Sequence, residues 1–186
     1  AMVRKEAPGA EINLIPSLRG TIVEFGGQRV DQLEELPEGA WVLNGDRGLT
    51  YSPQVPKGSE VIAGEWWPAD YKGPALVSLD IRVAESMAVG VGDSLTISVL
   101  GVEIPTKIAS LREVKWENFG LNYALVFSPG TFDATPHSMV ATLTVPAKAE
   151  RALAKSIPPA FPSSSLIQVG EVVSQVTVLL QQMAQA

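Results

Sequence analysis

Hydrophobic and polar residues alternate along much of the chain with the period of two that is typical of β-strands. This pattern predicts a hairpin over residues 18–30, in which Gly26 and Gly27 supply the tight reversal. A proline at position 105 should lie at a sheet edge or a bulge, because it has no N–H to donate. Further strands are expected at residues 41–43, 61–63, 94–100, 102–104, 106–111, 122–127, 138–145 and 166–169.

Three segments instead repeat apolar residues at spacings of three and four, which predicts helices. The first spans residues 79–88 with Ser78 as its N-cap, and the second spans residues 147–157 before two prolines. The third spans residues 170–186. The predicted fold class is therefore α+β, a β-rich mixed-sheet lobe with about three helices.

Length and charge narrow the class of protein further. The chain has 186 residues, 46% of them apolar, and 14 basic against 20 acidic side chains for a net charge of -6. We expect one domain over residues 17–186, with a loop-rich sub-lobe around residues 31–75. Residues 1–16 are interpreted as a tag scar, Ala1 before Met2, and an incomplete N-terminal edge. No Lys/Arg stripe that would bind nucleic acid is found.

Residues able to carry out a reaction are sparse. The chain has no cysteine, and its one histidine, His137, precedes Ser138; neighbours on a strand point to opposite faces, so an exposed turn histidine is favoured over a catalytic base. The sequence has no G-x-S-x-G or D-x-D-x-D motif. Residues 90–95 begin like a phosphate-binding G-x-G-x-x-G motif but lack the last glycine and precede a strand. We predict no catalytic residue, metal or cofactor.

Large aromatic side chains gather in two loops, as Trp66 with Trp67 and as Trp116 with Phe119. Such rings can stack on sugars or anchor a partner protein. They can instead form a small core that fixes long loops to the sheet, and we favour this interpretation about two to one. The two roles are compatible, because adjacent tryptophans can face opposite ways.

The last 31 residues, from Ser156, contain one charged side chain, Glu171. A terminal helix on a water-exposed domain usually has Lys and Glu on its wet face. The segment is therefore either a helix packed on the core or a stalk approaching a membrane, where charge is costly. The apolar stripe of this predicted helix consists of Val172, Val173, Val176, Leu180 and Met183.

Several stretches occur in an order found in one class of transporter. They are LRGTIV at 18–23, GEWW at 64–67, VSLD at 77–80, VGDSLT at 91–96 and LREVKWENFGLNYALVFSPG at 111–130. The order resembles the extracytoplasmic domain of bacterial FtsX-like, MacB-related ABC transporter permeases. Within that class it is most similar to the permeases associated with lysophospholipase or arylesterase biosynthesis or export. The resemblance covers about residues 17–186, and the run at 111–130 is its most specific part.

This resemblance implies a MacB-type periplasmic core on the outer face of the bacterial inner membrane, between two membrane helices. It implies no enzyme activity, since that domain has no catalytic motif. The domain would relay movement driven by a cytoplasmic ATP-binding subunit, which acts through the membrane helices, to a periplasmic lipoprotein, an esterase or a lipid cargo. Trp66, Trp67, Trp116 and Phe119 would then contact the partner or organise the loops, and the stripe from Val172 to Met183 would couple to the membrane.

Two other functions stay open. The tryptophan pairs also fit a secreted β-rich module that binds carbohydrate or protein. A hydrolase is disfavoured, because His137 is the one base that can be named. The family's domain usually opens with a further strand before the region of Ile12, which this chain lacks, so an open sheet edge is expected there.

Overall fold

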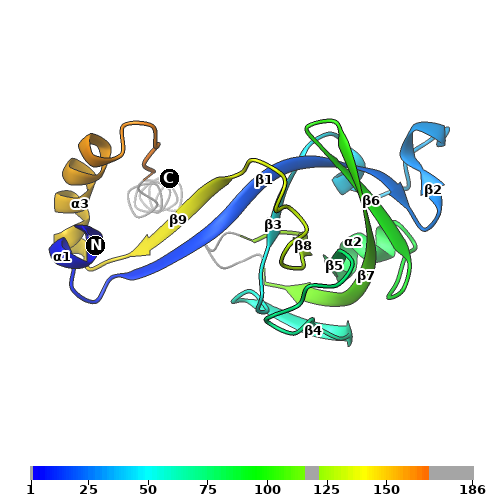
Figure 1. Ribbon diagram of the computed structural model, residues 1–186, viewed down its shortest axis with the longest axis horizontal. Coiled ribbons are helices and arrows are strands. Elements are labelled where there is room, and N and C mark those ends of the chain that lie inside the picture. Colours follow the sequence, from blue (N-terminus) through cyan, green and yellow to red (C-terminus); the bar gives the residue numbers. More distant parts are fainter. Residues whose placement is uncertain (1, 116–121, 168–186) are drawn as a thin grey trace, which may run out of the picture. The chain divides into compact units, whose positions relative to one another are not determined.

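The computed structural model describes residues 2–115 and 122–167, and the chain divides into two compact units. We call residues 14–142 the barrel unit and residues 1–13 with 143–186 the helical unit. The predicted domain boundary at residue 17 and the sub-lobe stay predictions. In chain order the elements are α1 (Met2–Glu6), β1 (Glu11–Phe25), β2 (Gln28–Arg29), η1 (Val30–Gln32), η2 (Trp41–Leu43), β3 (Arg47–Tyr51), β4 (Ser59–Gly64), β5 (Leu76–Asp80), α2 (Ile81–Ser86), β6 (Ser94–Val99), β7 (Val102–Val114), β8 (Leu125–Phe127), β9 (Ser138–Thr144) and α3 (Ala147–Ala160) (Figure 1).

Six strands of the barrel unit form a closed ring of hydrogen-bonded neighbours. The ring runs β1–β3–β8–β5–β7–β6 and returns to β1 (Figure 1). The β3–β8 and β5–β7 pairs are parallel, and the other four are antiparallel. Strands β2 and β9 pair with β1, and β4 pairs with β7. Closure satisfies both edges of each ring strand, which an open sheet cannot do.

This architecture shows that the predicted α+β class was wrong. The chain is mostly β, with 39% strand against 18% helix, and its six-stranded barrel is closed, whereas a β-rich mixed-sheet lobe with about three helices was predicted. The physical reason is long-range pairing. Alternation identifies a strand and its buried face, but it does not say that Leu49 of β3 aligns with Leu125 of β8.

Several local predictions were right. The hairpin exists as β1 and β2, and Gly26 and Gly27 adopt φ values of 55° and 81° at its turn. The two strands predicted at residues 102–104 and 106–111 form a single strand, β7, which runs through Pro105 and continues to Val114. Pro105 pairs with Thr96 of β6 at a point before β5 joins the other side of β7 at Lys107. The proline therefore lies at a locally unpaired edge, where a missing N–H costs nothing.

The predicted helix at 79–88 is shorter in the structure. Residues 76–80 belong to β5, so α2 begins at Ile81 and its N-cap is Asp80, which accepts a 2.9 Å bond from the Arg82 N–H. Ser78 is fully buried in β5 and does not cap the helix. The capping signal was real, but a carboxylate two residues later took the role that the sequence analysis gave to the serine.

Other local predictions were wrong or lie outside the described residues. Trp41–Leu43 is a 3-10 helix and no strand, and β3 was missed. Helix α3 continues through both prolines to Ala160, because the φ of proline is compatible with a last helical turn. Leu166 and Ile167 are not in a strand. The predicted helix at 170–186 lies outside the described residues.

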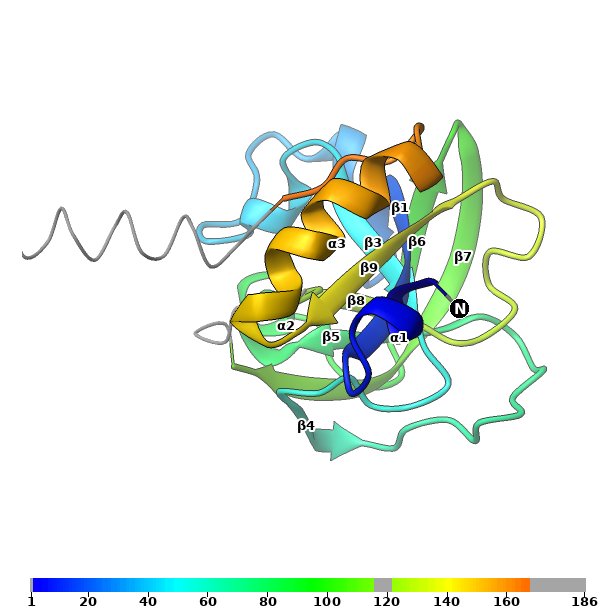
Figure 2. The same ribbon diagram turned by 90° about the vertical axis from the view of Figure 1, so that its left-hand side faces the viewer.

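Each unit has its own hydrophobic core. In the helical unit, α1 and α3 (Figure 2) pack around Ala7, Leu153 and Ile157, and the Ser156 hydroxyl donates to Glu6 Oε2 at 2.5 Å. In the barrel unit the core combines strand residues with one face of α2, which packs against β5 and β7. Its fully buried members include Ile22, Leu49, Val77, Leu79, Leu95, Ile97, Ile108, Leu125, Phe127 and Phe132.

Candidate functional site

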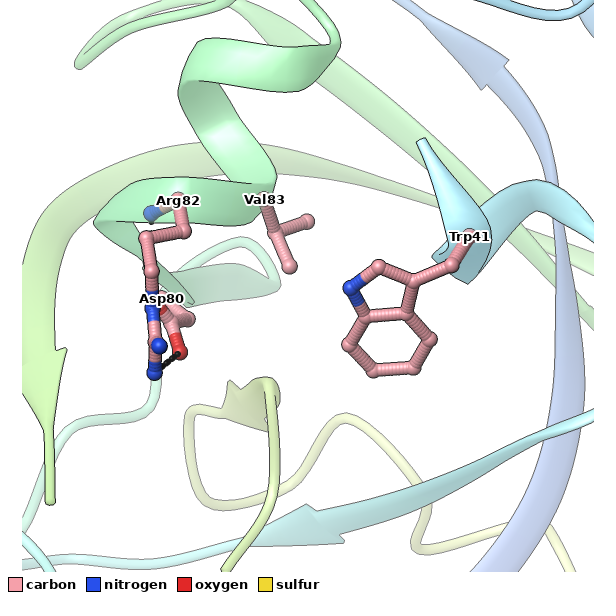
Figure 3. Close-up of a pocket in the computed structure, with 4 residues that line it drawn as sticks. All are labelled: Trp41, Asp80, Arg82 and Val83. Atoms are coloured by element: carbon pink, nitrogen blue, oxygen red, sulfur yellow. Dashed lines mark hydrogen bonds and ion pairs between the residues drawn. The ribbon is translucent and has the colours of Figure 1, made fainter. Parts of the chain in front are cut away.

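A pocket of about 260 Å³ opens on the barrel unit where β5 ends and α2 begins. Trp41 of η2, Asp80 at the end of β5, and Arg82 and Val83 in the first turn of α2 line it (Figure 3). Figure 3 shows the indole on one side of the pocket and the Asp80–Arg82 pair on the other. The pocket therefore has an aromatic wall facing a polar wall.

The aromatic wall is held rigidly although it is half exposed. Trp41 is 47% exposed, while the next two residues, Val42 and Leu43, are buried in the core. The Arg47 guanidinium lies 5.2 Å from the centroid of the indole and donates to the carbonyl oxygens of Trp41 (2.8 Å), Val42 (3.3 Å) and Asn44. These bonds fix the short helix that presents the ring, so an incoming group meets a preformed surface.

The polar wall is an ion pair with one buried and one exposed member. The Asp80 side chain is 2% exposed and that of Arg82 is 62% exposed. Arg82 Nη2 lies 3.3 Å from Asp80 Oδ2, Arg82 Nε donates to Oδ1 at 3.5 Å, and Nη2 also reaches the Val114 carbonyl at 3.4 Å. The carboxylate thus sets the plane of the guanidinium, whose Nη1 makes no hydrogen bond within residues 2–115 and 122–167.

Behind the pocket lies a buried polar network centred on Arg112 of β7, which is 1% exposed. Its guanidinium donates to the hydroxyls of Ser78 (3.0 Å) and Ser59 (2.9 Å) and to the carbonyl oxygens of Ser78, Tyr123 and Ala124 at 3.0–3.4 Å. Burial lowers the pKa of Arg112 to about 10, and the charge of Asp80, its register partner on β5, opposes that shift. Arg112 therefore stays protonated at neutral pH.

Neither the pocket nor this network was predicted from the sequence. Trp41 was assigned to a strand, and Arg112 follows a buried strand pattern in which a charge is unexpected. The available signal was a charged residue, Arg112, directly after an apolar alternating run and opposite serines on a neighbouring strand. Recognising it required the pairing of β5 with β7.

The structure brings Trp66 and Trp67 together on one loop. Their ring centroids are 4.2 Å apart, and their indole N–H groups donate to the carbonyl oxygens of Pro53 (3.2 Å) and Ser52 (2.8 Å). Trp67 is 4% exposed and Trp66 is half-buried. Both rings thus contact the loop at residues 52–53. Whether they also contact a partner stays a prediction.

His137 lies beside Tyr51. Its Nδ1 donates to the Thr135 carbonyl (3.0 Å), which leaves Nε2 to accept from the Tyr51 hydroxyl (3.2 Å). The two rings meet edge to face at 5.5 Å. Both imidazole nitrogens therefore have partners other than Ser138, the residue considered as a nucleophile.

The remaining predicted site residues lie outside the described residues: Trp116, Phe119, Val172, Val173, Val176, Leu180 and Met183. Within residues 2–115 and 122–167, no three His, Asp or Glu side chains gather as metal ligands. Over the same residues, no helix has the length and apolar character needed to cross a membrane.

No family model matches the chain. Among curated proteins, a match is found to the "Uncharacterized ABC transporter permease YbbP" of Escherichia coli (strain K12), with 28% identity over 134 residues. The chain is similar to an ABC transporter permease. The matched segment covers 72% of this chain and 16% of YbbP, so the chain corresponds to a small part of that relative. The match to YbbP supports a relationship to ABC permeases. The link to the lysophospholipase-associated members stays a prediction.

Proposed function

We propose that this chain is a non-catalytic extracytoplasmic module of an ABC transporter permease of the FtsX-like, MacB-related class. The observation that carries the proposal is the 28% identity to YbbP over most of the chain, which supports a transporter-related role. The module relays movement of the membrane helices, driven by a cytoplasmic ATP-binding subunit, to an envelope partner. That partner is a lipoprotein, an esterase or a lipid cargo, as in permeases linked to lysophospholipase or arylesterase export.

Three features support a mechanical role. The closed barrel, with Arg112 joining β4, β5 and the segment before β8, gives a lobe that moves as one piece. The apolar stripe from Val172 to Met183 supplies the connection to the membrane, and the loop of Trp66 and Trp67 supplies the surface for a partner.

The placement outside the membrane is tested by cysteine accessibility in the full-length permease with its own cysteines replaced. This chain has no cysteine, so a single one at exposed Lys57 gives a clean signal. We expect a membrane-impermeant maleimide to label it in intact spheroplasts. The matched control is Val42→Cys, which is fully buried and should react only after unfolding. Labelling at position 57 only after lysis contradicts the proposal.

The relay itself is tested by interrupting the connection. We expect the distance between spin labels on the barrel and on the cytoplasmic side of the permease to change when ATP is trapped by vanadate. A flexible Gly-Ser insertion after Ser165 should abolish this change while ATP hydrolysis continues. The same insertion in the exposed turn at residues 56–58 should leave it intact. A change that survives the first insertion contradicts the relay.

A further inference from the structure

We propose that the pocket between Trp41 and the Asp80–Arg82 pair is a binding site for an uncharged sugar ring of a glycan. This site goes beyond the relay, and it exists whether or not the relay proposal holds. It also differs from the sugar-binding alternative drawn from the sequence, which relied on Trp66 and Trp67.

The shape and size of the pocket suit a single sugar ring. The pocket measures about 260 Å³, which is room for one sugar ring with its substituents but not for a folded partner element. One wall is the flat indole of Trp41, which is 47% exposed and has the Arg47 guanidinium over its ring at 5.2 Å from the centroid. A flat aromatic surface that is both exposed and immobile suits the C–H face of a pyranose ring, because little ordering entropy is lost on stacking.

The second step concerns hydrogen bonding. Sugar hydroxyls need fixed polar groups opposite the aromatic wall, and Arg82 provides them. Asp80 engages Nε and Nη2 of its guanidinium, so Nη1 is oriented with two N–H donors directed away from the carboxylate. A charge-assisted donor in a fixed plane is a strong partner for neighbouring hydroxyl oxygens.

The third step separates a neutral ring from an anion. The Arg82 charge is compensated by Asp80 at 3.3 Å, and the Arg112 charge is held within a cage of carbonyl and hydroxyl oxygens. The whole chain carries a net charge of -6, which repels anions at longer range. Because Asp80 already engages the pocket guanidinium, the pocket discriminates through hydroxyls and shape, and therefore fits a neutral sugar.

The test titrates the 186-residue chain with cellotetraose, chitotetraose and maltotetraose, and with tetragalacturonate as the anionic comparison. Binding is followed by the indole N–H resonance of Trp41, one of four tryptophans, assigned from the spectrum of Trp41→Phe. We expect saturable binding of at least one neutral oligosaccharide below about 10 mM, with the largest shift at Trp41.

Three variants complete the test, each checked for folding by thermal melting. Trp41→Ala should weaken binding about tenfold or more, Arg82→Gln should weaken it severalfold, and Trp41→Phe should weaken it less than Trp41→Ala. Phe161→Ala, which removes an exposed aromatic ring outside the barrel unit, is the matched control and should leave affinity unchanged. The proposal is overturned by no saturable binding of the neutral sugars, by binding of tetragalacturonate alone, or by affinity that survives in folded Trp41→Ala.

Discussion

Replacing Arg112 by methionine should destabilise the barrel unit more than an ordinary core substitution. Methionine has a similar volume but no donors, so the change leaves the hydroxyls of Ser59 and Ser78 and three backbone carbonyl oxygens without this partner. It also removes the cation beside the buried carboxylate of Asp80. Removing one member of a buried charged network costs about 3–5 kcal/mol, a large share of a total stability of about 5–15 kcal/mol.

The assay is urea unfolding at pH 7, followed by far-UV circular dichroism, with the free energy taken by linear extrapolation. At about 2–4 °C per kcal/mol for a chain of this size, the melting temperature should fall by roughly 6–20 °C. Arg112→Lys is the matched control. It keeps the charge but has no planar fork to reach five acceptors, so its loss should lie between the wild type and methionine.

A double-mutant cycle with Asp80→Asn isolates the charge coupling. We expect a coupling free energy of about 1 kcal/mol or more, since the two residues are register partners on adjacent strands. An Arg112→Met variant as stable as the wild type would refute the reasoning, because it would show that desolvation of the guanidinium offsets all of its bonds.

Three further predictions concern the backbone and pH. Gly64→Ala should lower the free energy of unfolding by at least about 2 kcal/mol, since φ is +72° and a Cβ would collide with the Ala109 carbonyl oxygen. The control is Gly45→Ala, at φ +73° with open space around it, which measures the cost of the positive φ alone in the same unfolding assay. Leu100→Asn should raise the free energy of unfolding by about 1 kcal/mol, since Leu100 is 78% exposed at φ 50° in a two-residue hairpin turn, and a lower free energy of unfolding would contradict this. Glu24→Gln should lower stability at pH 7 and by less in acid. Burial raises the pKa of Glu24, but bonds from Ser94, Thr96 and Gly27 outweigh that and lower the pKa from 4.5. The resulting stability is therefore present above pH 4.5 and lost as the pH falls through the folded-state pKa, and a loss that stays equal throughout an acid titration would count against this.

The sequence predicted local structure where a short-range signal decides the outcome. Gly26 and Gly27 turn the first hairpin because two positive φ values are needed there. The alternation in β6 and β7 survives because the two strands are joined by a two-residue turn, so their pairing is local. Pro105 was placed correctly at an edge for the same reason, since a missing N–H is a property of one residue.

Closure of the barrel could not be predicted in this way. It depends on β3 pairing with β8 and β5 with β7 in parallel, and neither pair is adjacent in the chain. Strand β3 was missed because Arg47 and Gly48 weaken its pattern, although Leu49 and Thr50 are buried. The pocket was missed as a consequence, because Trp41 and Arg82 face each other only after the barrel is formed.

Asp80 explains why the pocket and the buried network belong to one physical unit. Its carboxylate caps α2 through the Arg82 N–H, orients the Arg82 side chain at the surface, and lies beside Arg112 in the interior. Arg112 in turn joins Ser59 of β4 to the carbonyl oxygens that precede β8. The geometry of the exposed guanidinium thus depends on a buried carboxylate that interacts with both Arg82 and Arg112. A substitution at Arg112 that leaves the fold intact should therefore still alter the orientation of Arg82, although the two side chains are on different elements.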